Sequence, residues 1–111
     1  TIEALLCDEI MTELNKLAQD ELVMLKLTLP SKNNLYKAIV EHPNVIRFVA
    51  LSGGYTQEEA NNLLRKNDGI IASFSRALTE GLNAQQTDDE FNQLLATSIT
   101  AICDASMNKI N

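Results

Sequence analysis

The run Leu22-Val-Met-Leu-Lys-Leu-Thr-Leu-Pro30 decides the fold, because it is almost wholly apolar and contains a single lysine, Lys26. Asp20-Glu21 precedes the run and Pro30-Ser31 closes it, so it forms one short element. A continuous apolar run of this length is typical of a strand buried on both faces of a parallel sheet. We therefore predict a buried strand over Leu22–Leu27.

Lys26 is the chemically notable residue of this strand. A buried ammonium group must find a partner or lose its proton, because desolvation disfavours the charged form. A lysine whose pKa is lowered in this way can attack a carbonyl and form a Schiff base. The alternative is a lysine near the end of the strand whose amino group reaches water. Alternation along the strand places Met24, Lys26 and Thr28 on one face.

Outward from this strand the chain alternates between helical and strand patterns. Two further apolar runs, Val45–Leu51 and Ile70–Phe74, are predicted to be strands. Thr56 with Glu59 and Thr87 with Glu90 match capping boxes that begin helices. Helical patterns cover residues 1–18, Leu35–Val40, Thr56–Leu64, a turn that includes Arg76, and Thr87–Ile102. The resulting order, α-βα-βα-βα, calls for an α/β fold with parallel strands.

Composition narrows the class of protein. The 111 residues carry a formal net charge of −6, with 15 acidic and 9 basic side chains, so a nucleic-acid partner is not expected. No apolar stretch approaches the roughly 18 residues of a membrane span, and no membrane partner is expected. One histidine, His42, and two distant cysteines, Cys7 and Cys103, do not suggest a metal site. Free thiols favour a cytoplasmic location.

The size of the chain indicates a piece of a larger domain. Three parallel strands would leave the edges at Leu22–Leu27 and Ile70–Phe74 unpaired, and a complete eight-stranded α/β barrel needs about 250 residues. We therefore expect residues 1–111 to be part of one barrel domain. This chain would then need the remainder of the barrel or self-association as a partner. The alternative is a complete protein from which Met was removed before Thr1.

Two loops suggest a phosphate site. Ser52-Gly53-Gly54 follows one predicted strand, and Ser73-Phe74-Ser75-Arg76 ends the next. Active-site residues of α/β barrels lie at the carboxyl ends of the strands. Glycine lets the backbone approach an anion, and an arginine adds two parallel donors. Two such loops at successive strand ends, preceded by a lysine within a strand, form a specific pattern.

These residues resemble class I (Schiff-base) fructose-bisphosphate aldolases, most closely the bacterial branch. The matching stretches are Leu22–Pro30, Leu51–Tyr55 with Glu58-Glu59-Ala60, and Ile71–Leu78. The resemblance implies that the chain is the carboxyl-terminal portion of a TIM (β/α)8 barrel. It would comprise the last three βα units and one preceding helix.

The resemblance also implies roles for individual residues. Lys26 would be the Schiff-base lysine. The phosphate next to the ketone would be held by Ser52, Gly53, the backbone of Ser75 and the side chain of Arg76, with Ser73 as a weaker candidate. The substrate would be a phosphorylated sugar, fructose 1,6-bisphosphate, cleaved without a cofactor to dihydroxyacetone phosphate and glyceraldehyde 3-phosphate.

Three features depart from the animal enzymes of this family. Position 75 is serine instead of glycine, Lys26 is followed by Leu-Thr-Leu-Pro, and the chain has no terminal tyrosine. Two other classes remain open. A transaldolase-like enzyme would keep the lysine without both loops, whereas a non-catalytic phosphate-binding module would keep the loops and tolerate Lys26→Arg.

Overall fold

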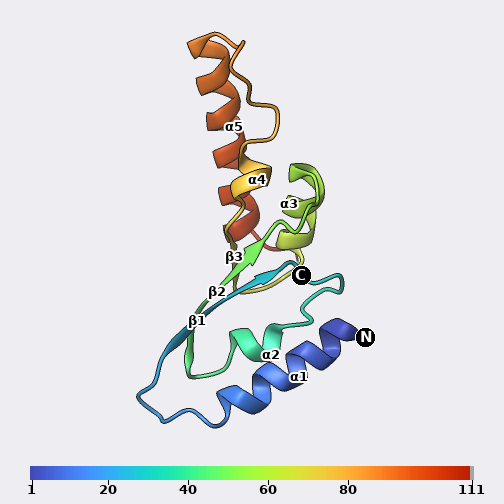
Figure 1. Ribbon diagram of the computed structural model, residues 1–111, viewed down its shortest axis with the longest axis vertical. Helices are drawn as coiled ribbons and strands as arrows, with labels where there is room; N and C mark the ends of the chain where they lie inside the picture. The colour runs from blue at the N-terminus through green and yellow to red at the C-terminus, as the bar shows by residue number, and fades with distance from the viewer. Residues whose placement is uncertain (111) are drawn as a thin grey trace.

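A computed structural model describes residues 1–110 as an open sheet of three strands with five helices (Figure 1). The elements are α1 (Ile2–Leu14), β1 (Val23–Thr28), α2 (Lys37–Val40), β2 (Val45–Leu51), α3 (Gln57–Arg65), β3 (Ile70–Ala72), α4 (Ser75–Leu78) and α5 (Asp88–Met107). The predicted α/β class and the predicted order of elements are confirmed. No helix within residues 1–110 is both long enough and apolar enough to cross a membrane.

The three strands are parallel, as predicted, and lie in the order β1-β2-β3. Their register sets which side chains share a face of the sheet. Leu25 pairs with Phe48, and Phe48 pairs with Ile70, so these three residues form one row. The next row, on the opposite face, contains Lys26, Val49 and Ile71.

The prediction that β1 is buried on both faces is wrong. Val23, Leu25 and Leu27 are half-buried, whereas the alternate residues Met24, Lys26 and Thr28 are exposed. The reason is that the hydrophobic core lies on one face only. This core contains Phe48, Ala50 and Ile70 of the sheet, packed with Leu14, Leu29, Tyr36, Ile39, Ala60, Leu64, Phe74, Ala77 and Ala105.

Local hydrogen bonds explain where the elements end. The first helix was predicted to run to residue 18, but α1 ends at Leu14. The segment after it turns, because the Ala18 amide donates to Glu21 Oε1 and Asn44 Nδ2 donates to the carbonyls of Ala18 and Glu21. β3 is shorter than the predicted strand Ile70–Phe74 and stops at Ala72.

Both predicted capping boxes are confirmed. The side chains of Thr56 and Thr87 accept from the amides of Glu59 and Glu90, and each glutamate accepts in return from the threonine amide. These reciprocal bonds satisfy amides that the first turn of a helix leaves free. The thiols of Cys7 and Cys103 are both free.

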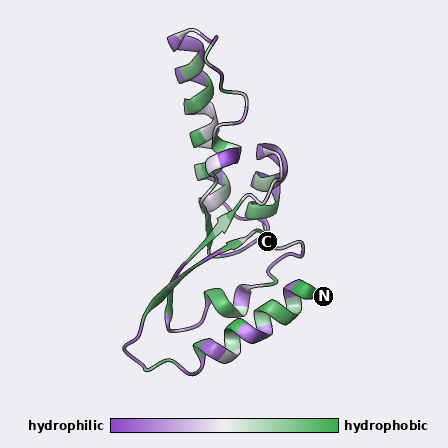
Figure 2. Cartoon of the chain, viewed as in Figure 1, coloured by the Kyte–Doolittle hydropathy of each residue, from purple (hydrophilic) through white to green (hydrophobic). Residues whose placement is uncertain are grey.

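The helices divide into two groups along the sheet (Figure 1). α1 contacts α2, and α2 contacts β2, whereas α3, α4 and α5 contact one another and α3 and α5 also contact β3. The molecule is elongated, 52 × 30 × 24 Å, and α5 extends beyond the sheet at one end (Figure 1). The strands are mostly hydrophobic in sequence, although one of their faces is open (Figure 2).

Candidate functional site

The two predicted loops meet at the carboxyl ends of the strands. A small hollow of about 130 Å³ is lined by the predicted phosphate-binding residues together with Thr28 and Leu51. The predicted residues in this lining are Ser52, Gly53, Ser73, Ser75 and Arg76. The register explains the convergence, since Thr28 pairs with Leu51 at the end of the sheet and the Ser73 amide donates to the Ala50 carbonyl.

The first loop requires glycine at position 53. Gly53 has φ +66°, in the left-handed region that other residues rarely adopt. A Cβ added there would overlap the Thr28 Cγ2 methyl, so the backbone of the loop lies directly against β1. Within residues 1–110, the Gly53 amide donates to no backbone carbonyl. This amide is therefore available to an anion in the hollow.

The second loop supplies the positive charge. β3 ends at Ala72, Phe74 is buried, and α4 begins at Ser75. Arg76 is exposed and, within the described residues 1–110, is the only charged side chain that lines the hollow. No ion pair joins it to an acidic residue of the described chain 1–110. The guanidinium can therefore turn both of its parallel N–H donors to a ligand.

Lys26 lies near this hollow but does not line it. It is on the same face of β1 as Thr28, two residues earlier, which is about 6.6 Å along a strand. Its neighbours in the same row are Val49 and Ile71, both apolar and half-buried. The expected burial of Lys26 is wrong for residues 1–110, because its side chain stands on the open face of the sheet.

Sequence reasoning missed Thr28 and Leu51 as lining residues. Thr28 had been placed on the face of Lys26, but nothing in the sequence indicated that the Ser52-Gly53-Gly54 turn would fold back against it. The signal available was the requirement for glycine, which implies close approach of another chain segment. The spacing does not say which segment approaches.

Another lysine, Lys109, has a lowered pKa. Lys109 Nζ donates to the carbonyls of Leu64 at 2.9 Å, Ile70 at 2.7 Å and Ala105 at 3.0 Å. Burial lowers the pKa of Lys109 to about 8, and nearby Asp68 opposes this shift. Ile70 is the first residue of β3, so Lys109 lies at the amino end of the strand, away from the hollow. All three donors of its ammonium group are used, which indicates a structural role.

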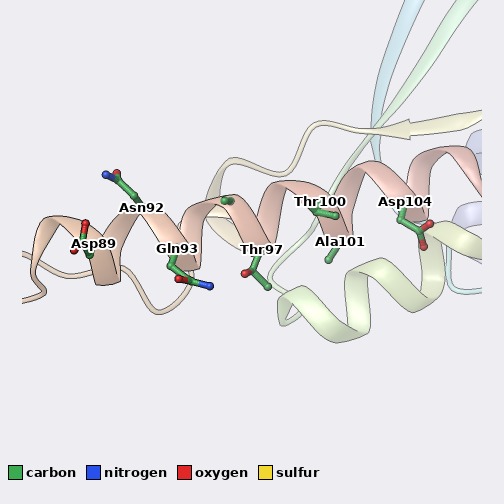
Figure 3. A pocket seen from close by; sticks show the side chains of 8 residues that line it. Asp89, Asn92, Gln93, Thr97, Thr100, Ala101 and Asp104 are labelled. Atoms are coloured by element: carbon green, nitrogen blue, oxygen red, sulfur yellow. The ribbon is translucent and has the colours of Figure 1, made fainter.

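A wider hollow, of about 980 Å³, lies elsewhere, along one face of α5 (Figure 3). Its lining repeats at helical spacing and includes Asp89, Gln93, Thr97, Ala101 and Asp104. In the part of the chain that the structure describes, the lining contains two aspartates and no basic side chain. It therefore does not suit a phosphorylated ligand, and the small hollow beside Gly53 and Arg76 is the candidate site.

Similarity to a curated protein agrees with the motifs, whereas no family model matches the chain. The chain is 60% identical over 105 residues to "Fructose-bisphosphate aldolase class 1" of Synechocystis sp. (strain ATCC 27184 / PCC 6803 / Kazusa). The match covers 95% of this chain and 35% of that protein, so the chain spans about a third of the length of the curated relative it matches. The resemblance of this chain to class I fructose-bisphosphate aldolase is thereby confirmed over nearly its whole length.

Proposed function

We propose that residues 1–111 form the carboxyl-terminal three βα units, with one preceding helix, of a class I fructose-bisphosphate aldolase barrel. The observation that carries this proposal is the convergence of Ser52, Gly53, Ser73, Ser75 and Arg76 on one hollow. That hollow opens on the face of the sheet that carries Lys26. In a closed barrel this face would be the interior, where layers of side chains exclude water.

The chemistry would begin at Lys26. In the closed barrel, its neighbours Val49 and Ile71 would desolvate the amine and lower its pKa. The neutral amine would attack the ketone of fructose 1,6-bisphosphate, and loss of water would give an iminium ion. That cation would accept the electrons of the adjacent carbon–carbon bond, releasing glyceraldehyde 3-phosphate. Protonation and hydrolysis of the remaining enamine would free dihydroxyacetone phosphate.

The loops would fix the substrate relative to the amine. The Gly53 amide and the Arg76 guanidinium would hold the phosphate next to the ketone, with the nearby hydroxyls completing the shell. Among residues 1–110, no aspartate or glutamate lines the hollow. The acid and base that move protons must therefore come from other parts of the barrel, and we expect residues 1–111 alone to be inactive.

The rest of the barrel would also cover the two sheet edges. Beside β1, an apolar groove is lined by Ile10, Leu14 and Leu17 of the first helical segment. Beside β3, a second groove is lined by Phe74, Ile99 and Ile102. Neighbouring βα units would bury both grooves, at about 25 cal/mol for each Å² of apolar surface. Sedimentation of residues 1–111 tests this point, since a stable 12.3 kDa monomer would contradict it.

Borohydride trapping tests the function. Reduction of the complete barrel protein in the presence of dihydroxyacetone phosphate should fix the three-carbon unit on Lys26, located by mass spectrometry of peptides. Label on Lys109, Lys16 or another lysine would overturn the assignment. A transaldolase-like enzyme would trap its own ketose donor but not dihydroxyacetone phosphate, and a non-catalytic module would trap neither.

A further inference from the structure

We propose that Thr28 is a further phosphate-binding residue, whose hydroxyl joins the two loops as a ligand and whose methyl positions Gly53. This inference rests on the proposed function, because it deepens the description of the same hollow. No motif of the sequence pointed to Thr28, which was predicted only as the last residue on the face of Lys26.

The position of Thr28 is the first argument. It is the last residue of β1 and pairs with Leu51, directly before the Ser52-Gly53-Gly54 turn. It lines the same hollow as Gly53 and Arg76, and its side chain is exposed there. β1 therefore carries both Thr28, which lines the hollow, and Lys26.

The contact with Gly53 is the second argument. A Cβ at Gly53 would overlap Thr28 Cγ2, so the methyl lies against the glycine backbone. The same Cβ position lies 3.7 Å from Thr28 Oγ1, so the hydroxyl stands beside Gly53 as well. A phosphate oxygen bound at the Gly53 amide would therefore lie close to a second donor.

The third argument is that the Thr28 hydroxyl has an unused hydrogen-bond donor. Several other threonine hydroxyls bond the backbone: Thr12 and Thr79 donate to helix carbonyls, and Thr56 and Thr87 accept from helix amides. The Thr28 hydroxyl has no such partner within residues 1–110. In the same described residues, Thr97 and Thr100 of α5 have no hydroxyl partner either, but neither of them lines the small hollow. Such a hydroxyl can donate a hydrogen bond to an anion without giving up a protein partner, and hydrogen bonds to charged groups are the stronger ones.

Two substitutions separate the roles of hydroxyl and methyl. Thr28→Val keeps the branched shape and the strand preference but removes the donor. Thr28→Ser keeps the donor and removes the methyl. Thr100→Val makes the same chemical change on the exposed surface of α5, and so serves as the matched control. All three are made in the complete barrel protein that contains this chain.

The probe is inorganic phosphate, titrated as a competitive inhibitor and by direct calorimetry, together with steady-state cleavage of fructose 1,6-bisphosphate. For Thr28→Val we expect phosphate affinity to fall about tenfold. KM should rise by a similar factor and kcat should stay within about twofold. Thr28→Ser should keep phosphate affinity within about threefold, and Thr100→Val should match the unmodified protein.

Unchanged phosphate affinity and KM in Thr28→Val would overturn the proposal. Loss of affinity in Thr28→Ser but not in Thr28→Val would also overturn it, because the methyl alone would then act. The failure of the proposed function is a separate result. If Lys26 is not trapped in the unmodified protein, the aldolase assignment fails, yet the phosphate titration still tests Thr28, since phosphate binding needs no Schiff base.

Discussion

A lysine lies near each end of the sheet, and the two lysines differ in exposure and in hydrogen bonding. At the carboxyl end, Lys26 stands exposed on an open face, next to a hollow that suits an anion. At the amino end, Lys109 is partly buried, uses all three donors on carbonyls and has a pKa lowered to about 8. The comparison teaches that a lowered pKa does not by itself mark a reactive amine. Lys26 differs from Lys109 in that its side chain is exposed and lies near the hollow proposed to bind phosphate.

The largest expected effect comes from replacing each lysine in the complete barrel protein, which tests the difference between them. Lys26→Met should abolish borohydride trapping and lower kcat on the order of a thousandfold or more, because the proposed nucleophile is lost. Lys109→Met should leave kcat for each folded molecule nearly unchanged. Trapping measured in both variants checks the assignment, and a reversed pattern would exchange the two roles.

Removing the positive charge from the hollow should have the next largest effect. Arg76→Ala should weaken substrate binding by about 1.5–3 kcal/mol, since a charge-assisted bond to phosphate is lost. Arg65 is the control, because it pairs with Asp104 at 3.5 Å, away from the hollow. Arg65→Ala should leave KM unchanged. Equal effects of the two variants on phosphate inhibition would show that Arg76 faces elsewhere.

Replacing Lys109, at the amino end of the sheet, should lower stability and leave activity unchanged. Lys109→Met removes the donor of three carbonyls and should lower the free energy of unfolding by about 1–3 kcal/mol. Lys32 is exposed, so Lys32→Met should change stability by less than about 0.5 kcal/mol. Urea unfolding curves of both variants measure the difference. Similar free energies of unfolding for the two variants would mean that water replaces Lys109 as the hydrogen-bond donor to these carbonyls at no cost.

The glycines of the first loop give a smaller contrast. Gly53→Ala should cost about 1–2 kcal/mol for the left-handed backbone, and more because the new Cβ meets Thr28. Gly54 has φ +86° but no atom within 4 Å of an added Cβ, so Gly54→Ala should carry only the backbone cost. Thermal unfolding of the two variants measures this order, and an equal cost would argue against the contact.

The last expected effect is a slope of stability with pH. In the folded chain the pKa of Lys109 is about 8, below its ordinary value of 10.5, so between these values the unfolded chain binds more protons. The contribution of Lys109 to stability should therefore rise as pH increases from 8 to 10.5, and be lost as pH falls through 8. Lys109→Met should reduce this slope in unfolding curves taken at several pH values.

Local signals in the sequence predicted most of the fold and the residues of the two loops. The capping boxes at Thr56 and Thr87 begin helices at the expected residues because their hydrogen bonds join positions only three apart. Burial was less predictable. The apolar run of β1 predicts a strand that is buried on both faces. Burial depends on side chains from distant parts of a chain, and within residues 1–110 only one face of β1 is packed.

The contacts that join distant segments could not be predicted. Lys109 follows a long amphipathic helix and looks like an ordinary exposed lysine in the sequence. Two of its three partners, the carbonyls of Leu64 and Ile70, lie at least 39 positions away, and a carbonyl is a group that every residue possesses. Thr28 was missed as a lining residue for the same reason, because its contact with Gly53 depends on the register of two strands.

That register also decides where the chain can change in length. Lys26 and Thr28 share a face because one residue separates them, and inserting or deleting a residue there would turn Lys26 toward the helices. The same holds for β2 up to Gly53, where the contact with Thr28 fixes the end of the strand. Segment 79–86, between α4 and α5, carries no such constraint. We expect length variation among relatives to gather there and to be absent within Lys26–Thr28 and from Val45 to Gly53.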